Sequence, residues 1–218
     1  MRRAYTVVPL LLLLALAGVG ASAPGSDAAA AGVLEGVQRW LDGTRDLQGK
    51  FEQRVVSGAL GSGLAESGNL WIERPGRMRW DYLDPERKVA LVRDDKTWFY
   101  LEDDEQLIRG RLEPGSDLLP ALLTGGTRLD ALFDASLAEP GDASTVRLEL
   151  VPRGGSEHFV RVVLTVPRED FSIREAEVLD AAGNEIHYRF VDLRRNSGLA
   201  PETFVFEPPP GTLVSGQH

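Results

Sequence analysis

Apolar and polar side chains alternate along most of this sequence, in short segments bounded by Gly, Pro, Asn and Asp. In one such segment the apolar residues Val146, Leu148 and Leu150 are separated by charged ones. A period of two residues is typical of a half-buried β-strand, and short strands in close succession are typical of an antiparallel meander. About nine to eleven strands are expected, and a single sheet of that size must curl, which makes one face concave. We predict strands at residues 49–55, 65–73, 77–83, 88–93, 96–101, 146–150, 160–166, 172–179, 185–192 and 203–207.

Three segments carry apolar residues at helical spacing instead. In residues 32–42 the apolar side chains fall on one face of a helix, and clustered leucines predict two short helices or helical turns at 117–123 and 128–133. A helix with one apolar face buries it against another element. We therefore expect these helices to plug the concave face of the sheet. The residues on the apolar face of the first helix are Val33, Leu34, Val37, Trp40 and Leu41.

The N-terminus has the pattern of a secretory signal peptide. Arg2 and Arg3 precede an apolar run that is too short for a membrane span, which needs about 20 residues, and small residues follow the run. We predict cleavage after Ala21, because the alternative cut after Ala23 would leave Pro24 as the first residue. A retained N-terminal anchor is the competing interpretation. The expected organisation is a signal peptide at 1–21, a flexible mature N-terminus at 22–31 and a single domain at 32–218.

Composition narrows the possible functions. The sequence has no cysteine, which excludes disulfides, thiol chemistry and lipidation of the chain itself. Its net charge is -9, and removal of Arg2 and Arg3 leaves 22 Lys and Arg against 33 Asp and Glu, a net charge of -11. An acidic surface argues against nucleic acid as a partner and against tight binding to anionic membranes. It favours a soluble protein, and we expect a monomer.

No arrangement of residues typical of an enzyme is present in the sequence. His158, His187 and His218 are not spaced as metal ligands, and there is no nucleophile-elbow, P-loop or dinucleotide-binding motif. The acidic run at 102–105 lacks the spacing of a calcium loop, so we interpret it as a solvated hairpin turn. We therefore predict a binding protein with no catalytic residue, no metal and no cofactor. Apolar residues on alternating strand positions indicate an apolar ligand.

Three elements in order carry a resemblance to a known family. They are F-E-Q at 51–53, G-N-L-W-I-E-R-P-G-R-M-R-W-D-Y at 68–82 and F-V-F-E-P-P at 204–209. Together they resemble the outer-membrane lipoprotein carrier protein family, LolA, over nearly the whole mature chain. The resemblance implies an incomplete, strongly curved antiparallel β-barrel, mainly β with helices, whose helical lid closes over an apolar cavity.

The resemblance also implies a function and partners. Members of the family take acylated lipoproteins from an inner-membrane, ATP-driven lipoprotein-releasing complex. They carry them across the periplasm to an outer-membrane lipoprotein receptor, which is a related protein lipidated on an N-terminal cysteine. Since this sequence has no cysteine, it resembles the soluble carrier rather than the receptor.

Arg74 is the residue to which the resemblance gives a specific role. It matches the arginine before proline that in the family hydrogen-bonds to the lid helices. A guanidinium suits that role because its five donors can hold several backbone carbonyls and it stays charged. The lid segments would be 118–123 and 129–133. A surface arginine at the end of a strand is the competing interpretation.

A set of large apolar side chains is expected to line the cavity. Strand alternation sends neighbours to opposite faces, so Trp71 and Ile72 should point in opposite directions. Ordinary core packing remains the alternative for about half of the set. Met78 departs from the phenylalanine usual in the family, and a flexible thioether adapts to varied packing. The residues expected to line the cavity are Phe51, Leu70, Ile72, Met78, Trp80, Tyr82, Trp98, Leu118, Leu119, Leu122, Leu129 and Leu132.

Two other functions fit the same expected fold. A periplasmic carrier of another lipid or glycolipid would need the same apolar cavity. A sensor of mislocalised lipoproteins would bind the same ligand but would normally carry further domains. A fold alone does not decide between a carrier of lipoproteins and a carrier of other lipids.

Overall fold

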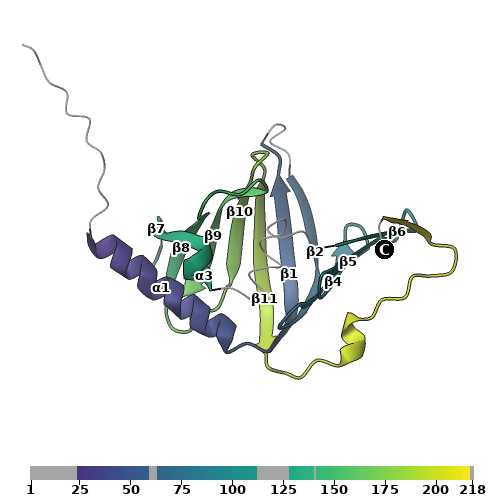
Figure 1. The fold of residues 1–218 in the computed structure, drawn as a ribbon, viewed down its shortest axis with the longest axis horizontal. Coiled ribbons are helices and arrows are strands. Elements are labelled where there is room, and N and C mark those ends of the chain that lie inside the picture. Colours follow the sequence, from purple (N-terminus) through teal and green to yellow (C-terminus); the bar gives the residue numbers. More distant parts are fainter. Residues whose placement is uncertain (1–23, 59–62, 112–127, 140, 217–218) are drawn as a thin grey trace, which may run out of the picture.

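The computed structural model describes residues 24–58, 63–111, 128–139 and 141–216 (Figure 1). They form one open sheet of twelve strands in the order β12-β6-β5-β4-β3-β2-β1-β11-β10-β9-β8-β7. All neighbouring strands are antiparallel except β12, which is parallel to β6. The predicted fold, a mainly β protein with one strongly curved antiparallel sheet, is confirmed.

Two meanders meet side by side in this sheet. The pairing of β1 with β11 joins them, with Phe51 opposite Phe190. The first meander comprises β1 (Asp46–Val56), β2 (Gly63–Glu73), β3 (Arg77–Asp84), β4 (Lys88–Arg93), β5 (Lys96–Leu101) and β6 (Gln106–Arg111). The second comprises β7 (Phe133–Ala138), β8 (Thr145–Pro152), β9 (Phe159–Pro167), β10 (Glu175–Asp180) and β11 (Glu185–Arg195).

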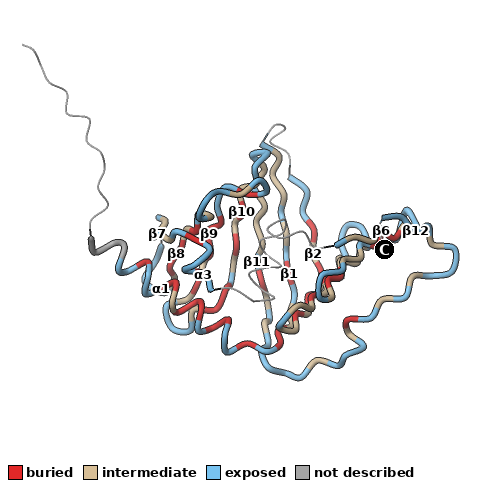
Figure 2. The backbone as a smooth tube through the Cα atoms, in the orientation of Figure 1, coloured by how far each residue is buried: buried red, intermediate tan, exposed pale blue. Residues whose placement is uncertain are grey.

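Burial alternates along the strands, as the period of two predicts. In β8 the side chains of Val146, Leu148 and Leu150 are buried and the intervening residues are more exposed (Figure 2). The tight turns lie where glycine or a short polar residue allows a positive φ. Gly76 (φ 82°) joins β2 to β3, and Gly183 (φ 84°) lies in the hairpin predicted between β10 and β11.

The first helix is longer than predicted. α1 (Pro24–Asp42) begins eight residues before the expected start at Gly32, so the described part of the segment predicted to be flexible is helical. Proline is favoured in the first turn of a helix, and the alanines that follow have the highest helix propensity. Ala30 is buried in the core. The apolar face predicted for residues 32–42 is buried as expected.

Other predictions at the level of elements were wrong. Residues 203–207 do not form a strand: η1 (Pro201–Phe204) is a 3-10 turn, followed by extended chain. By contrast, the short helix or helical turn predicted at 128–133 is present as α3 (Leu129–Leu132), a single turn because Phe133 already begins β7. Three strands were not predicted, namely β6, β7 and β12 (Leu213–Gly216). The helix predicted at 117–123 lies outside the described residues.

The two ends of the chain lie on opposite faces of the sheet. α1 packs against β7, β8 and α3, at one end of the sheet (Figure 1). The C-terminal segment passes over the other face, where η1 contacts β3 and β4 and Phe204 is buried. β12 then pairs with β6, so it protects the outer edge of the first meander. We refer to α1 and α3 together as the helical cap.

Candidate functional site

One face of the sheet is concave, and its aromatic side chains show how strongly it curves. Trp80 lies on β3 and Tyr188 on β11, which are separated by β2 and β1. In a flat sheet they would be roughly 14 Å apart, at about 4.8 Å per strand. Their ring centroids are 5.6 Å apart. Side chains converge in this way only on the inner face of a curved sheet.

An aromatic cluster occupies the middle of the concave face. The Phe51 ring lies 4.5 Å from Trp80 and 4.9 Å from Tyr82, centroid to centroid. Phe190 lies 6.2 Å from Trp80 and is stacked with Tyr188. These tilted and edge-on contacts are favourable for aromatic pairs. The cluster therefore draws together three strands from both meanders.

Aliphatic side chains surround the aromatic cluster on the same face. Leu70, Ile72 and Met78 are buried together with Val92 in the main core. On the second meander a row of inward aliphatic side chains on β8 and β9 is buried in the same core. These are Val146, Leu148, Leu150, Val162, Leu164 and Val166. Away from the β1–β2 hairpin, the concave face is thus a continuous apolar surface, and the helical cap covers its β7–β8 end.

The structure brings together most of the residues predicted to line the cavity. Five of them are buried on the concave face and Tyr82 is half-buried there. Leu129 of α3 is buried against the same core, whereas Leu132 is exposed. Leu118, Leu119 and Leu122 lie outside the described residues. The five buried residues are Phe51, Leu70, Ile72, Met78 and Trp80.

Trp98 does not lie on the concave face, and this prediction was wrong. It pairs with Leu91, which pairs with Arg79, which in turn pairs with Trp71. This row is on the convex face, where Arg79 donates hydrogen bonds to the carbonyls of the C-terminal segment. Because side chains alternate along β5, the neighbouring Phe99 takes the inward position that Trp98 was expected to occupy.

Several inward-facing aromatic residues were not predicted as site residues, among them Phe99, Tyr188 and Phe190. Phe99 is opposite Ala90 and Ile108, at the β6 end of the concave face, and is 37% exposed. Tyr188 and Phe190 belong to β11, which was predicted as a strand, although the inward face of that strand was not assigned. Their alternation with charged residues in the sequence was the signal that could have identified them.

The C-terminal end of α1 is held by two arginines from different strands. Arg74, at the end of β2, donates a hydrogen bond from Nη1 to the backbone carbonyl of Leu41. Arg195, at the end of β11, donates to the carbonyl of Trp40 over 3.0 Å and lies over its ring. Carbonyls at a helix C-terminus lack partners in the helix and carry partial negative charge, which favours cations.

Arg74 is half-buried at the end of the sheet nearest α1. Burial lowers the pKa of its guanidinium, and the charge of Asp42 opposes that change. Arg74 was expected to hydrogen-bond to the lid segment at 129–133. In the part of the chain that the structure describes, it forms no hydrogen bond to that segment. There Arg74 donates to α1, which belongs to the same helical cap.

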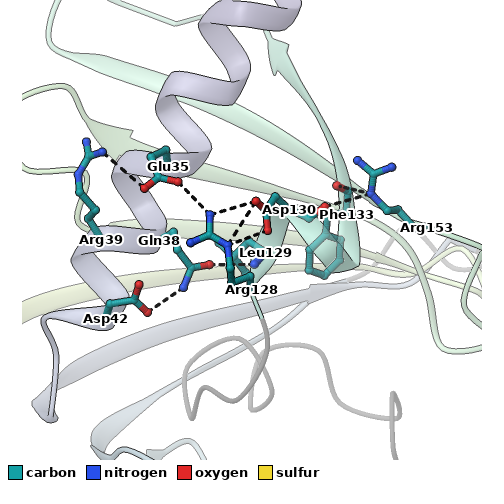
Figure 3. A network of polar contacts seen from close by, with 9 residues as sticks. All are labelled: Glu35, Gln38, Arg39, Asp42, Arg128, Leu129, Asp130, Phe133 and Arg153. Atoms are coloured by element: carbon teal, nitrogen blue, oxygen red, sulfur yellow. Dashed lines mark hydrogen bonds and ion pairs between the residues drawn. The ribbon is translucent and has the colours of Figure 1, made fainter.

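A polar network joins α3 to α1 (Figure 3). The buried side chain of Gln38 accepts a hydrogen bond from the backbone N–H of Leu129 at 2.8 Å and donates one to Asp42 at 2.8 Å. Arg128 forms ion pairs with Glu35 and Asp130 over 3.0 Å each. The hydrogen bond from Arg128 lowers the pKa of the Asp130 carboxyl. α3, which continues directly into β7, is therefore also fastened to α1.

The concave face becomes polar toward the β1–β2 hairpin. There the Tyr82 hydroxyl donates to Gln53 over 3.0 Å, and Gln53 in turn donates to Glu66 over 3.5 Å. Glu66 forms an ion pair with Lys88, and their side chains are only 6% and 14% exposed. A buried ion pair is costly to desolvate and is found where its partners are well satisfied. We refer to Gln53, Glu66, Tyr82 and Lys88 as the polar end of the concave face.

Neither a metal centre nor a membrane-spanning helix is found in the described part of the chain. Among residues 24–58, 63–111, 128–139 and 141–216, no group of three or more His, Asp and Glu side chains could hold a metal ion. None of the helices in that same part of the chain is long and apolar enough to cross a membrane.

Known proteins resemble this chain over most of its length. Residues 42–207 match the family described as outer membrane lipoprotein carrier protein LolA. An outer-membrane lipoprotein carrier protein of Alkalilimnicola ehrlichii is 34% identical over 181 residues, which cover 81% of this chain and 80% of that protein. One from Dechloromonas aromatica is 29% identical over 189 residues, which cover 86% and 89%.

A solved structure shares the fold. The crystal structure of an uncharacterized conserved protein from Thermus thermophilus matches with a TM-score of 0.55 at 15% sequence identity, covering 87% of this chain and 99% of that one. At that identity the likeness concerns the fold alone. The match of the family and the identity to its curated relatives lead to one conclusion. The chain belongs to the LolA family of outer membrane lipoprotein carrier proteins.

Proposed function

We propose that this protein is a soluble carrier of the periplasm that binds the acyl chains of lipoproteins on its concave face. It receives them from an inner-membrane, ATP-driven lipoprotein-releasing complex and delivers them to an outer-membrane lipoprotein receptor. The observation that carries the proposal is the continuous apolar surface of the concave face, covered in part by the helical cap. Relatives named as lipoprotein carriers support the choice of cargo.

The strength of acyl binding limits how the carrier can work. Each methylene group removed from water contributes about 0.8 kcal/mol. A triacylated lipoprotein presents on the order of 40 methylenes, so complete burial would contribute roughly 30 kcal/mol. The practical ceiling of non-covalent affinity is about 18–21 kcal/mol, and a carrier near that ceiling would not release its cargo. The concave face therefore buries only part of the acyl chains, or opening of the cap offsets part of the gain.

The helical cap is the element that would open. Its contacts with the β7–β8 end of the sheet bury the aliphatic surface that acyl chains would need. Arg74 and Arg195 hold one end of α1, and Gln38 holds α3 to α1. Opening costs these contacts, so the closed protein takes up cargo slowly on its own. The energy for loading would come from ATP hydrolysis by the releasing complex.

The test uses the chain without residues 1–21. It is added to inner-membrane vesicles that contain the releasing complex and a triacylated lipoprotein, with or without ATP. The expected result is a lipoprotein in the soluble fraction that co-purifies with the chain and requires both the chain and ATP. Absence of any such complex, with a releasing complex shown to be active on another carrier, contradicts the proposal.

A matched pair of variants connects the assay to the concave face. Phe99→Asp places a charge on that face at a position already 37% exposed, while Trp98→Asp places it on the convex face of the same strand. We expect only Phe99→Asp to reduce the amount of lipoprotein released from the vesicles into the soluble fraction. If the purified protein carries some other lipid and releases no lipoprotein, the alternative of another lipid or glycolipid as cargo is correct.

A further inference from the structure

Strand β3 changes character along its inward face. Met78 is buried among aliphatic side chains, Trp80 lies in the aromatic cluster, and Tyr82 belongs to the polar end. Inward residues are two positions apart, so this change extends over roughly 13 Å, at about 3.3 Å per residue. Trp80 therefore lies at the boundary between the apolar and the polar parts of the concave face. A lipid bound here would have its ester groups at such a boundary.

Trp80 carries a buried donor without a partner. The side chain is only 4% exposed. Its indole N–H has no hydrogen-bond acceptor among the residues that the structure describes. More than nine in ten buried polar groups in proteins have a partner, and an unpaired one is costly. An unpaired donor on a face that is otherwise apolar indicates that its acceptor comes from a ligand.

The neighbours of Trp80 explain why the described part of the chain supplies no acceptor. Across the adjacent strands it lies opposite Leu70 and Ala90, neither of which has a polar side chain. The rings of Phe51 and Phe190 pack against its indole. Phenylalanine at position 80 would satisfy the same apolar contacts without leaving an N–H unpaired.

We propose that the indole N–H of Trp80 donates a hydrogen bond to an acyl-ester carbonyl oxygen of the bound lipid. This inference rests on the proposed function, because it assumes that acyl chains bind the concave face. It adds an orientation: the ester-linked glycerol lies between Trp80 and the polar end, and the aliphatic chains run from there past Met78 toward α1. Trp80 is then a positioning residue that distinguishes ester-linked from purely hydrocarbon ligands.

The test compares ligands that differ only in the carbonyl. The probes are short peptides with an N-terminal S-(2,3-diacyloxypropyl)cysteine and the matching dialkyl ethers, and affinities are measured by calorimetry. The indole N–H of Trp80 is already removed from water, so a hydrogen bond to the ester carbonyl costs no further desolvation of the donor. We therefore expect the ester probe to bind with about fivefold higher affinity than the ether probe. A phospholipid with the same two chains, as diester and as diether, shows whether the cysteine peptide or the shared glycerol ester is recognised.

Variants assign any preference to Trp80. Trp80→Phe should bind both probes with the affinity of the parent protein for the ether, whereas the convex-face control Trp98→Phe should keep the preference for the ester. If Trp80→Phe fails to fold, β-(3-benzothienyl)alanine at position 80 keeps the bicyclic ring and removes only the N–H. If a folded variant at position 80 still binds the ester more tightly than the ether, the inference is wrong. It is also wrong if the parent protein binds ester and ether equally.

The two proposals fail in different ways. If neither probe binds the parent protein, acyl binding itself is absent and the proposed function is wrong. If both bind equally well, acyl binding stands and only the role of Trp80 is wrong. As an independent readout, the ¹⁵N–¹H signal of the Trp80 indole should move downfield with the ester and not with the ether.

Discussion

Arg74 and Arg195 reach the same helix end from two strands that are not neighbours. Each donates to a carbonyl of the last turn of α1, where the helix has no donors of its own. This arrangement fixes the helical cap to the end of the sheet at two points. It also gives the arginine of the R-P-G motif a structural role that depends on its donors rather than on its charge alone.

Replacement of Arg74 by leucine is expected to loosen α1. The Leu41 carbonyl keeps the hydrogen bond from the backbone N–H of Thr44 but loses the charged donor, which should lower the free energy of unfolding by about 1–3 kcal/mol. Backbone amides in the last turn of α1 should exchange their hydrogens faster. The control is Arg77→Leu at the start of β3, because Arg77 forms a partly exposed ion pair with Glu73 that contributes little. If the two variants unfold at the same urea concentration, the tethering role of Arg74 is contradicted. If the Arg74→Leu variant releases bound lipoprotein no faster than the parent protein does, the role of Arg74 in a lid is contradicted.

Asp46 gives the fold a defined dependence on pH. Burial would raise the pKa of its carboxyl, but hydrogen bonds from Gly198 and Ser197 outweigh burial and lower it below 3.8. A pKa lower in the folded than in the unfolded chain means that the ionised form stabilises the fold. That contribution is complete above about pH 5 and is lost as the pH falls through the unfolded-state and then the folded-state pKa.

We expect Asp46→Asn to destabilise the protein at pH 7 by about 1–3 kcal/mol, because the amide presents an N–H toward the donor of Gly198. The difference from the parent protein should stay constant down to about pH 5 and shrink at lower pH. Urea unfolding of both proteins at several pH values measures it. A difference that grows as the pH falls below 4 would mean that the carboxylate is not stabilised in the folded state.

At the scale of elements, α1 depends on a close approach at Gly36. A Cβ at that position would lie 2.5 Å from the ring of Phe171, in the connection between β9 and β10. Gly36→Ala is therefore expected to lower stability by about 1–3 kcal/mol, because the ring must move. Gly32→Ala on the same helix meets nothing within 4 Å and should raise stability by up to about 1 kcal/mol. Thermal unfolding of both variants tests the packing of α1, and a gain in stability from both would disprove it.

Local sequence patterns identified most of the strands but not the ones without a clear inward face. β4 and β5 were predicted with their observed bounds, because alternation and turn residues coincide there. β12 was missed because every one of its residues is exposed, so it carries no alternation. Residues 203–207, which are rich in aromatic and β-branched side chains, were predicted as a strand. Instead, Phe204 is buried and Arg79 binds the backbone on either side of it.

At the scale of the molecule, the sequence could not reveal which strands become neighbours. The pairing of β1 with β11 joins segments that are far apart in the sequence, and no local pattern contains that information. It brings Phe190 and Tyr188 into the aromatic cluster, which is why these two residues were missed. The wrong face for Trp98 has a simpler cause: in T-W-F-Y three aromatic residues follow one another, and only the register of β4 against β5 decides which of them points inward.

Site-specific crosslinking on the two faces of β5 tests most directly whether acyl chains occupy the concave face. A photoreactive phenylalanine analogue is placed at position 99 or at position 98, and each protein is irradiated during the ATP-dependent release assay with a lipoprotein that carries labelled acyl chains. Position 99 lies on the concave face and position 98 on the convex face. The account predicts labelled acyl adducts from position 99 and none from position 98. Adducts from position 98 alone, or from neither position while the lipoprotein is carried, would contradict it.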